Sequence, residues 1–281
     1  TILIWGAGKI GRGFVADLFF SNGYFIDFVD VDEKLVNQLN QNRKYRIYST
    51  SGKGAPQSKE ISNFAAHSAG SKEAANSLLK RAALMAVVVF PDAFDDIALM
   101  IAGAVKLRME AGQHNNLNIL ICANILNARK ILEEKYIRLL SQEEQAYARR
   151  HLGLVETLVI RVAIAPSEAM LREDELVVFT DSYPTLIADA RGFRGEAPKL
   201  ENVRYVEDIH AEEVRNLFVC RAEQAELVHL VDVLGAVLGR PSGWHRSTLP
   251  QNRRTHARRV RQAHVFDAEL LGCLVAFLQS V

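Results

Sequence analysis

Short, largely apolar runs alternate along the first two thirds of the chain with segments whose apolar residues recur every three to four positions. Residues 2–5, 84–90 and 118–122 are runs of the first kind and predict buried strands. Residues 92–109 carry apolar side chains at helical spacing and predict an amphipathic helix. Because strands without a polar face must be covered on both sides, the alternation predicts a doubly wound, mostly parallel α/β sheet.

The same patterns suggest where this sheet domain ends. Further strands are predicted at residues 24–29, 45–48, 153–165, 175–180 and 186–189. Beyond them the period changes, and residues 208–238 and 251–281 are almost continuously helical in pattern. The sequence therefore predicts two domains, a sheet domain over residues 1–190 and a mainly α-helical domain over residues 191–281.

A glycine-rich turn follows the first predicted strand, and its spacing is G-x-G-x-x-G. Gly6 can adopt the positive φ that the tight turn needs, and Gly8 has no side chain to hold a pyrophosphate away from the backbone. Gly11 allows the following helix to lie close to the strand, so that the positive end of the helix faces the phosphates. The pattern predicts a Rossmann-type fold with phosphate contacts from Gly6, Ala7, Gly8, Lys9, Ile10 and Gly11.

An acidic residue ends the second predicted strand at the distance expected for a dinucleotide site. Asp30 stands about 20 residues beyond the glycines, where such folds accept hydrogen bonds from the adenosine ribose. Asp32 and Glu33 add negative charge that would repel a 2′-phosphate. The sequence therefore predicts NAD rather than NADP as the cofactor.

Composition excludes several classes of protein. The 281 residues carry a formal net charge of +1 and are 49% hydrophobic, which favours an ordinary globular chain over a nucleic-acid-binding one. The three cysteines, Cys122, Cys220 and Cys273, form no C-x-x-C pair and predict reduced thiols in a cytoplasmic protein. The chain opens directly on a strand, and its apolar runs are too short to cross a membrane.

One basic cluster lies near the C-terminus, where residues 240–264 include seven arginines, three histidines and no acidic residue. A solvated helix face, a site for a sugar phosphate and a nucleic-acid patch are all compatible with this cluster. The histidines do not pair with carboxylates or cysteines at ligand spacing, so no metal site is predicted.

Six short motifs together connect the chain with a known family. They are residues 6–14, 28–31, 117–124, 151–156, 193–195 and 215–218. With these motifs the chain resembles the polyol-specific long-chain dehydrogenases. The resemblance implies NAD-dependent hydride transfer on a sugar alcohol, phosphorylated in this member, with Asn124 on the cofactor side. It also implies a helical substrate domain that is truncated here.

The catalytic signature of that family is altered in this chain. Where the family has a proton-exchanging lysine, an asparagine and a histidine, this sequence has Asn216, Arg221 and Gln224. An amide has no titrating proton near neutral pH, and an arginine stays charged, so none of the three is a base. Phe90 also replaces a small residue beneath the nicotinamide and is expected to crowd a ribose.

Three hypotheses therefore remain open. The first is an NAD-dependent oxidoreductase that uses Asn216, Arg221 and Gln224 as its substrate-side residues. The second is a catalytically silent homologue that binds a dinucleotide or a sugar phosphate. The third is a scaffold that binds no dinucleotide. The sequence does not indicate an oligomeric state.

Overall fold

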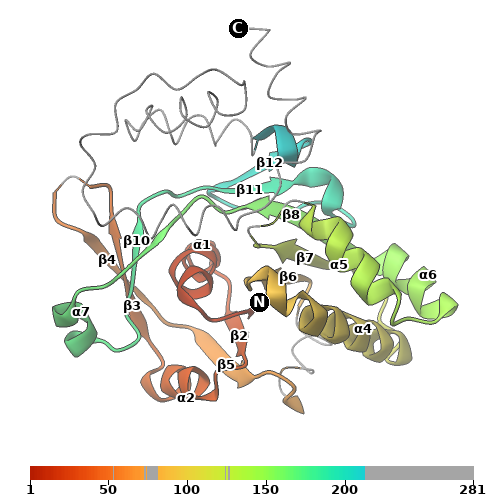
Figure 1. The fold of residues 1–281 in the computed structure, drawn as a ribbon, viewed down its shortest axis with the longest axis horizontal. Coiled ribbons are helices and arrows are strands. Elements are labelled where there is room, and N and C mark those ends of the chain that lie inside the picture. The colour runs from red at the N-terminus through yellow and green to blue at the C-terminus, as the bar shows by residue number, and fades with distance from the viewer. Residues whose placement is uncertain (53, 73, 75–81, 124, 126, 213–281) are drawn as a thin grey trace, which may run out of the picture. The chain divides into compact units, whose positions relative to one another are not determined.

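A computed structural model describes residues 1–212 except residues 53, 73, 75–81, 124 and 126 (Figure 1). The chain divides into a compact unit, Thr1–Ile209, and a second unit, His210–Val281.

The centre of the first unit is an eight-stranded sheet in the order β12-β11-β8-β7-β6-β1-β2-β5 (Figure 1). Its strands are β1 (Ile2–Trp5), β2 (Ile26–Asp30), β5 (Phe64–Ser68), β6 (Leu84–Val87), β7 (Leu117–Ile121), β8 (Leu152–Leu158), β11 (Leu186–Asp189) and β12 (Val203–Val206). All neighbouring strands are parallel except β8 and β11, which are antiparallel. The strands β2 and β5 follow β1 on one side of it, and the later strands of this sheet, from β6 to β12, lie on its other side. The strand order thus reverses between β1 and β6, the place where ligands bind in open α/β sheets.

Helices cover both faces of this sheet. The helical segment that follows β1 comprises a π-helix, Gly11–Val15, and α1 (Ala16–Ser21). The remaining helices of the main sheet are α2 (Glu33–Asn42), α4 (Phe94–Glu110), α5 (Ala128–Ile137) and α6 (Gln142–His151). Alternate residues of the central strands belong to different core clusters: Ile2 and Ile4 pack with α1, whereas Leu3 packs with α4 and α5. The two-sided burial explains why β1 and β6 are apolar throughout.

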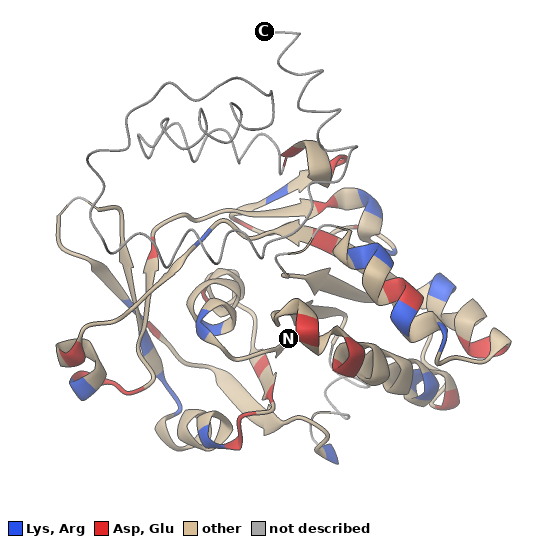
Figure 2. Cartoon of the chain, in the orientation of Figure 1, with Lys and Arg blue, Asp and Glu red and all other residues tan. Residues whose placement is uncertain are grey.

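Most charged side chains of the described residues lie outside this core, although Asp27 on β2 and Arg108 on α4 are fully buried. Helices α4, α5 and α6 carry both acidic and basic residues, while β1 and β6 carry neither (Figure 2).

α6 begins with a capping box, in which the Ser141 hydroxyl accepts the Glu144 N–H and the Glu144 carboxylate accepts the Ser141 N–H. Two otherwise unpaired donors at the helix start are thereby satisfied.

A second sheet of four strands, in the order β4-β3-β10-β9, packs against the π-helix. Its strands are β3 (Tyr45–Thr50), β4 (Gln57–Ile61), β9 (Ala163–Ile164) and β10 (Val178–Asp181), and α7 (Glu168–Glu173) lies between β9 and β10 in the chain. A Cβ added to Gly13 would lie 2.5 Å from Cγ1 of Val178. Glycine at this position therefore allows β10 to approach the helix closely.

The Rossmann-type α/β prediction is confirmed, with two corrections of detail. The single strand predicted over 153–165 is two strands, β8 and β9, which belong to different sheets. The main sheet also continues past residue 190, because β12 pairs with β11. Most of the region expected to form the helical domain, residues 213–281, lies outside the described residues. The two-domain division stays a prediction.

Candidate functional site

The glycine loop crosses the carboxyl end of β1, between the ends of β2 and β6. Gly6 has a φ of +104°, and a Cβ there would lie 2.2 Å from the carbonyl oxygen of Val88. Its N–H donates to the carbonyl of Val29 over 2.8 Å. Only glycine fits this backbone conformation and this gap, as the sequence predicts.

Gly8 and Gly11 differ sharply in their surroundings. A Cβ on Gly11 would lie 2.0 Å from the carbonyl oxygen of Gly6, so the helix starts in direct contact with the loop. A Cβ on Gly8 would meet no atom within 4 Å. The absence of a side chain at Gly8 is thus not required by the fold and leaves an open backbone face. This open face beside the start of a helix fits a pyrophosphate group, because the first N–H groups of a helix have no intrahelical acceptor.

Asp30 joins the end of β2 to the glycine loop. Its Oδ2 accepts the Ala7 N–H over 2.6 Å, and its Oδ1 accepts the Asp32 N–H over 2.9 Å. The parallel register of β1 and β2 explains this contact, since Trp5 lies opposite Val29. Asp32 itself caps α2 by accepting the N–H groups of Lys34 and Leu35. Of the acidic residues at this edge, Asp30 is therefore the one placed beside the loop.

Arg12 contacts the other side of the same loop, a role that the sequence motifs do not predict. Its side chain is 8% exposed, and Nε donates to the Ala7 carbonyl over 2.8 Å while Nη1 donates to the Leu176 carbonyl. Burial lowers the pKa of Arg12 from its usual value. The Ala7 residue is consequently fixed at both polar groups, its N–H by Asp30 and its C=O by Arg12. The sequence feature that could have indicated this role is the position of Arg12, a charged residue within the apolar face of the first helix.

The ends of β6, β7 and β8 continue the same edge of the sheet. Phe90 follows β6 and is 83% exposed. Cys122 follows β7, and burial raises the pKa of its thiol to about 11 even though Thr157 donates to its Sγ. The carboxylate of Glu156, which lies on β8 opposite the last residue of β7, accepts the Arg129 N–H in the first turn of α5 over 3.1 Å. This edge thus combines a protonated thiol, a helix-capping carboxylate and an exposed aromatic ring.

Comparison with known proteins identifies the family of the chain. Residues 1–202 match the family described as the mannitol dehydrogenase Rossmann domain. The chain belongs to this mannitol dehydrogenase family. Two curated relatives, the mannitol-1-phosphate 5-dehydrogenases of Streptococcus pneumoniae strains Hungary19A-6 and 70585, are each 29% identical over 233 residues. The match covers 83% of this chain and 60% of each relative, so the chain spans about three fifths of their length.

Solved structures share the fold of this mannitol dehydrogenase family member. A substrate-free D-sorbitol dehydrogenase superposes with a TM-score of 0.67 at 13% identity, covering 76% of this chain and 55% of that one. A Pseudomonas fluorescens mannitol 2-dehydrogenase in a ternary complex with NAD and D-mannitol gives 0.64 at 15% identity, covering 76% and 54%. The fold is thus shared at low sequence identity.

Four of the predicted site residues of this family member lie outside the described residues. They are Asn124, Asn216, Arg221 and Gln224. The basic cluster at 240–264 lies outside as well, so the roles of all these residues stay predictions. Within the described part of the chain, no group of three or more His, Cys, Asp or Glu side chains could hold a metal ion. No helix in that part is long and apolar enough to span a membrane.

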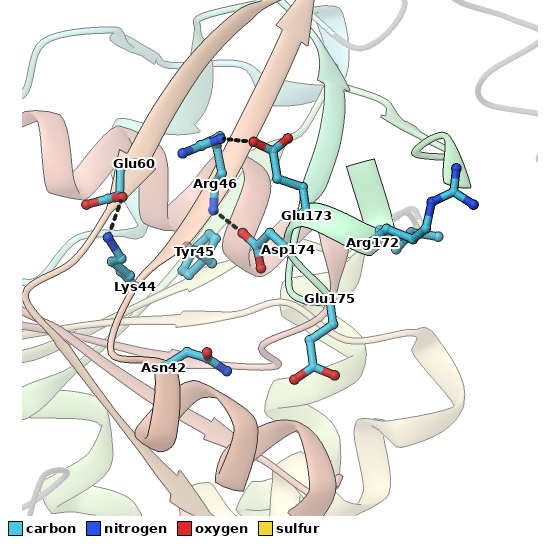
Figure 3. A pocket seen from close by; sticks show the side chains of 10 residues that line it. Asn42, Lys44, Tyr45, Arg46, Glu60, Arg172, Glu173, Asp174 and Glu175 are labelled. Carbon is cyan, nitrogen blue, oxygen red and sulfur yellow. Dashed lines mark hydrogen bonds and ion pairs between the residues drawn. The ribbon is translucent and has the colours of Figure 1, made fainter. Parts of the chain in front are cut away.

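A pocket of about 510 Å³ lies away from the glycine loop, between the start of β3 and the α7–β10 connection (Figure 3). Its cations have carboxylate partners: Lys44 lies 3.1 Å from Glu60, and Arg46 lies 3.0 Å from Glu173. The third cation, Arg172, is 3.8 Å from Glu168. With its positive charges paired in this way, the pocket is a poor site for a phosphate, and the glycine loop remains the candidate site.

Proposed function

We propose that this chain is an NAD-dependent polyol dehydrogenase that acts on a sugar alcohol phosphate, with mannitol 1-phosphate and fructose 6-phosphate as the expected pair. The observation that carries the proposal is the open face of Gly8 next to the Asp30 carboxylate. The name of the curated relatives supports the substrate. The NAD in the ternary complex of the structural neighbour supports the cofactor.

Different groups of the chain would bind different parts of the cofactor. The backbone N–H groups from Gly8 onward would donate to the diphosphate, and the Asp30 carboxylate would accept from ribose hydroxyl groups. Asp30 already accepts one N–H at each oxygen, and a carboxylate oxygen has a second lone pair for a ribose hydroxyl. Bound NAD would supply the hydride acceptor for alcohol oxidation.

Calorimetry and absorbance on the full chain test this proposal together. NAD is expected to bind, and NADH formation at 340 nm is expected with mannitol 1-phosphate in preference to mannitol or sorbitol. The two unphosphorylated alcohols are matched control substrates. Mannitol lacks only the phosphate, and sorbitol lacks the phosphate and also differs at one stereocentre. Absence of NAD binding would overturn the whole proposal, whereas binding without turnover would leave the silent homologue.

The Asp30→Asn variant is expected to bind NAD about tenfold to a hundredfold more weakly. The amide oxygen can still accept the Ala7 N–H, so the loop is retained, but the charge-assisted bonds to the ribose are lost. Glu33→Gln removes a neighbouring exposed carboxylate and is expected to leave the NAD affinity unchanged. Equal affinities for the two variants in calorimetry would show that Asp30 does not contact the cofactor.

The altered catalytic signature favours a second candidate, a silent homologue that binds NAD or a sugar phosphate without turnover. Neither Asn216 nor Gln224 can accept a proton from the alcohol. If the chain lacks turnover because it lacks a base, the combined Asn216→Lys and Gln224→His variant is expected to form NADH. The rate should rise with pH, because the lysine accepts a proton only when it is deprotonated. The single Gln224→His variant is the control, since it restores no lysine. Equal rates for the two variants would contradict this explanation.

A further inference from the structure

Two exposed apolar side chains stand on either side of the glycine loop. Among the large hydrophobic residues of the described part, Phe90 at 83% and Val31 at 79% are the most exposed. Phe90 follows the end of β6 and Val31 follows the end of β2, the two strands that flank β1. Exposure of a ring this large is unfavourable, and here it occurs at the edge of the sheet that carries the candidate site.

The backbone holds Phe90 close to the loop. The Val88 N–H donates to the Trp5 carbonyl over 2.8 Å, and Cγ1 of Val89 would lie 3.4 Å from a Cβ on Gly6. The chain then turns at Pro91 into a short 3₁₀-helix, Pro91–Ala93, and the Phe90 carbonyl accepts the Ala93 N–H over 3.0 Å. Phe90 therefore has an extended, fixed backbone two residues beyond the contact with Gly6.

The position of Phe90 relative to Asp30 indicates which half of a dinucleotide it would meet. Asp30 ends β2 on one side of β1, and Phe90 follows β6 on the other side. If Asp30 accepts from the adenosine ribose and the diphosphate crosses Gly8, the second nucleoside extends toward the end of β6.

We propose that Phe90 is a positioning residue that packs against the nicotinamide half of the dinucleotide. The inference rests on the proposed function, because it requires a dinucleotide in the site. An aromatic ring would supply apolar area, ring stacking and, for the positively charged oxidised nicotinamide, a cation–π attraction. The 83% exposure of Phe90 leaves the ring face available for this contact, rather than packed within the protein.

The test compares NAD⁺ with ADP-ribose, which lacks the nicotinamide ring, by calorimetry on the 281-residue chain. Phe90→Ala is expected to weaken NAD⁺ binding about tenfold and to leave ADP-ribose binding unchanged. Phe90→Trp, which restores an aromatic face, is expected to recover the NAD⁺ affinity. Leu99→Ala, at an exposed position on α4, is the matched control and is expected to change neither affinity.

The outcomes separate this inference from the proposed function. If Phe90→Ala changes both affinities equally, changes neither, or tightens NAD⁺ binding as expected for a crowding ring, the inference is overturned while dinucleotide binding stands. If the unsubstituted chain binds neither NAD⁺ nor ADP-ribose, the proposed function fails, and the inference fails with it. Selective loss of NAD⁺ affinity supports the inference.

Discussion

Gly6→Ala is expected to lower the free energy of unfolding by about 3 kcal/mol or more, because a methyl group at this position meets two penalties. The φ of +104° is unfavourable for any residue with a Cβ, and the added carbon would lie 2.2 Å from the carbonyl oxygen of Val88. That oxygen belongs to the backbone just beyond β6, so moving it aside would distort the chain at the end of that strand. Urea unfolding followed by circular dichroism, without NAD present, measures the loss.

Gly8→Ala is the matched control for this substitution. A Cβ on Gly8 meets nothing within 4 Å, so the free energy of unfolding is expected to stay within about 1 kcal/mol of the parent value. Its NAD affinity is nevertheless expected to fall more than tenfold, because the methyl group would occupy the face proposed for the diphosphate. Normal NAD binding by Gly8→Ala would contradict this placement of the diphosphate. Equal stability of the two variants would contradict the loop geometry.

Arg161→Met is expected to destabilise the protein by about 3 kcal/mol, since it removes a buried cation with several partners. The guanidinium is 8% exposed and donates to the Gly13 carbonyl over 3.0 Å, to Oδ2 of Asp17 over 2.7 Å and to the Tyr183 carbonyl over 2.7 Å. It also lies 4.7 Å from the centre of the Phe14 ring. The side chain thereby ties the helix that follows the glycine loop to the segment between β10 and β11.

Lys59→Met provides the control, because Lys59 pairs with the same carboxylate from a more exposed position. Its Nζ lies 2.6 Å from Oδ1 of Asp17, and its side chain is 41% exposed. The expected loss is about 1 kcal/mol or less and should shrink further at high salt, whereas the effect of Arg161→Met should persist. Urea unfolding at low and high salt distinguishes the two. Similar, salt-sensitive losses would show that the buried contacts of Arg161 contribute little.

The glycine loop was predictable because its requirements are local. Positive φ at Gly6 and close contact at Gly11 follow from backbone sterics within a few residues, and the structure has both. The acid at the end of the second strand was predictable from spacing alone, and its contact with Ala7 follows from parallel pairing of β1 and β2. Whether these residues bind NAD stays a prediction.

The alternation of buried strands and amphipathic helices, and with it the Rossmann-type sheet, follows from the hydrophobic pattern of the chain, because burial on two faces favours apolar residues at successive strand positions. The second sheet does not follow from that pattern: its strands β3 and β10 pair in parallel, with Ile47 opposite Val178, although they lie more than a hundred residues apart in the chain. The burial of Arg12 and Arg161 does not follow from it either. Such pairings and buried charges depend on partners distant in the sequence, which no local period can specify.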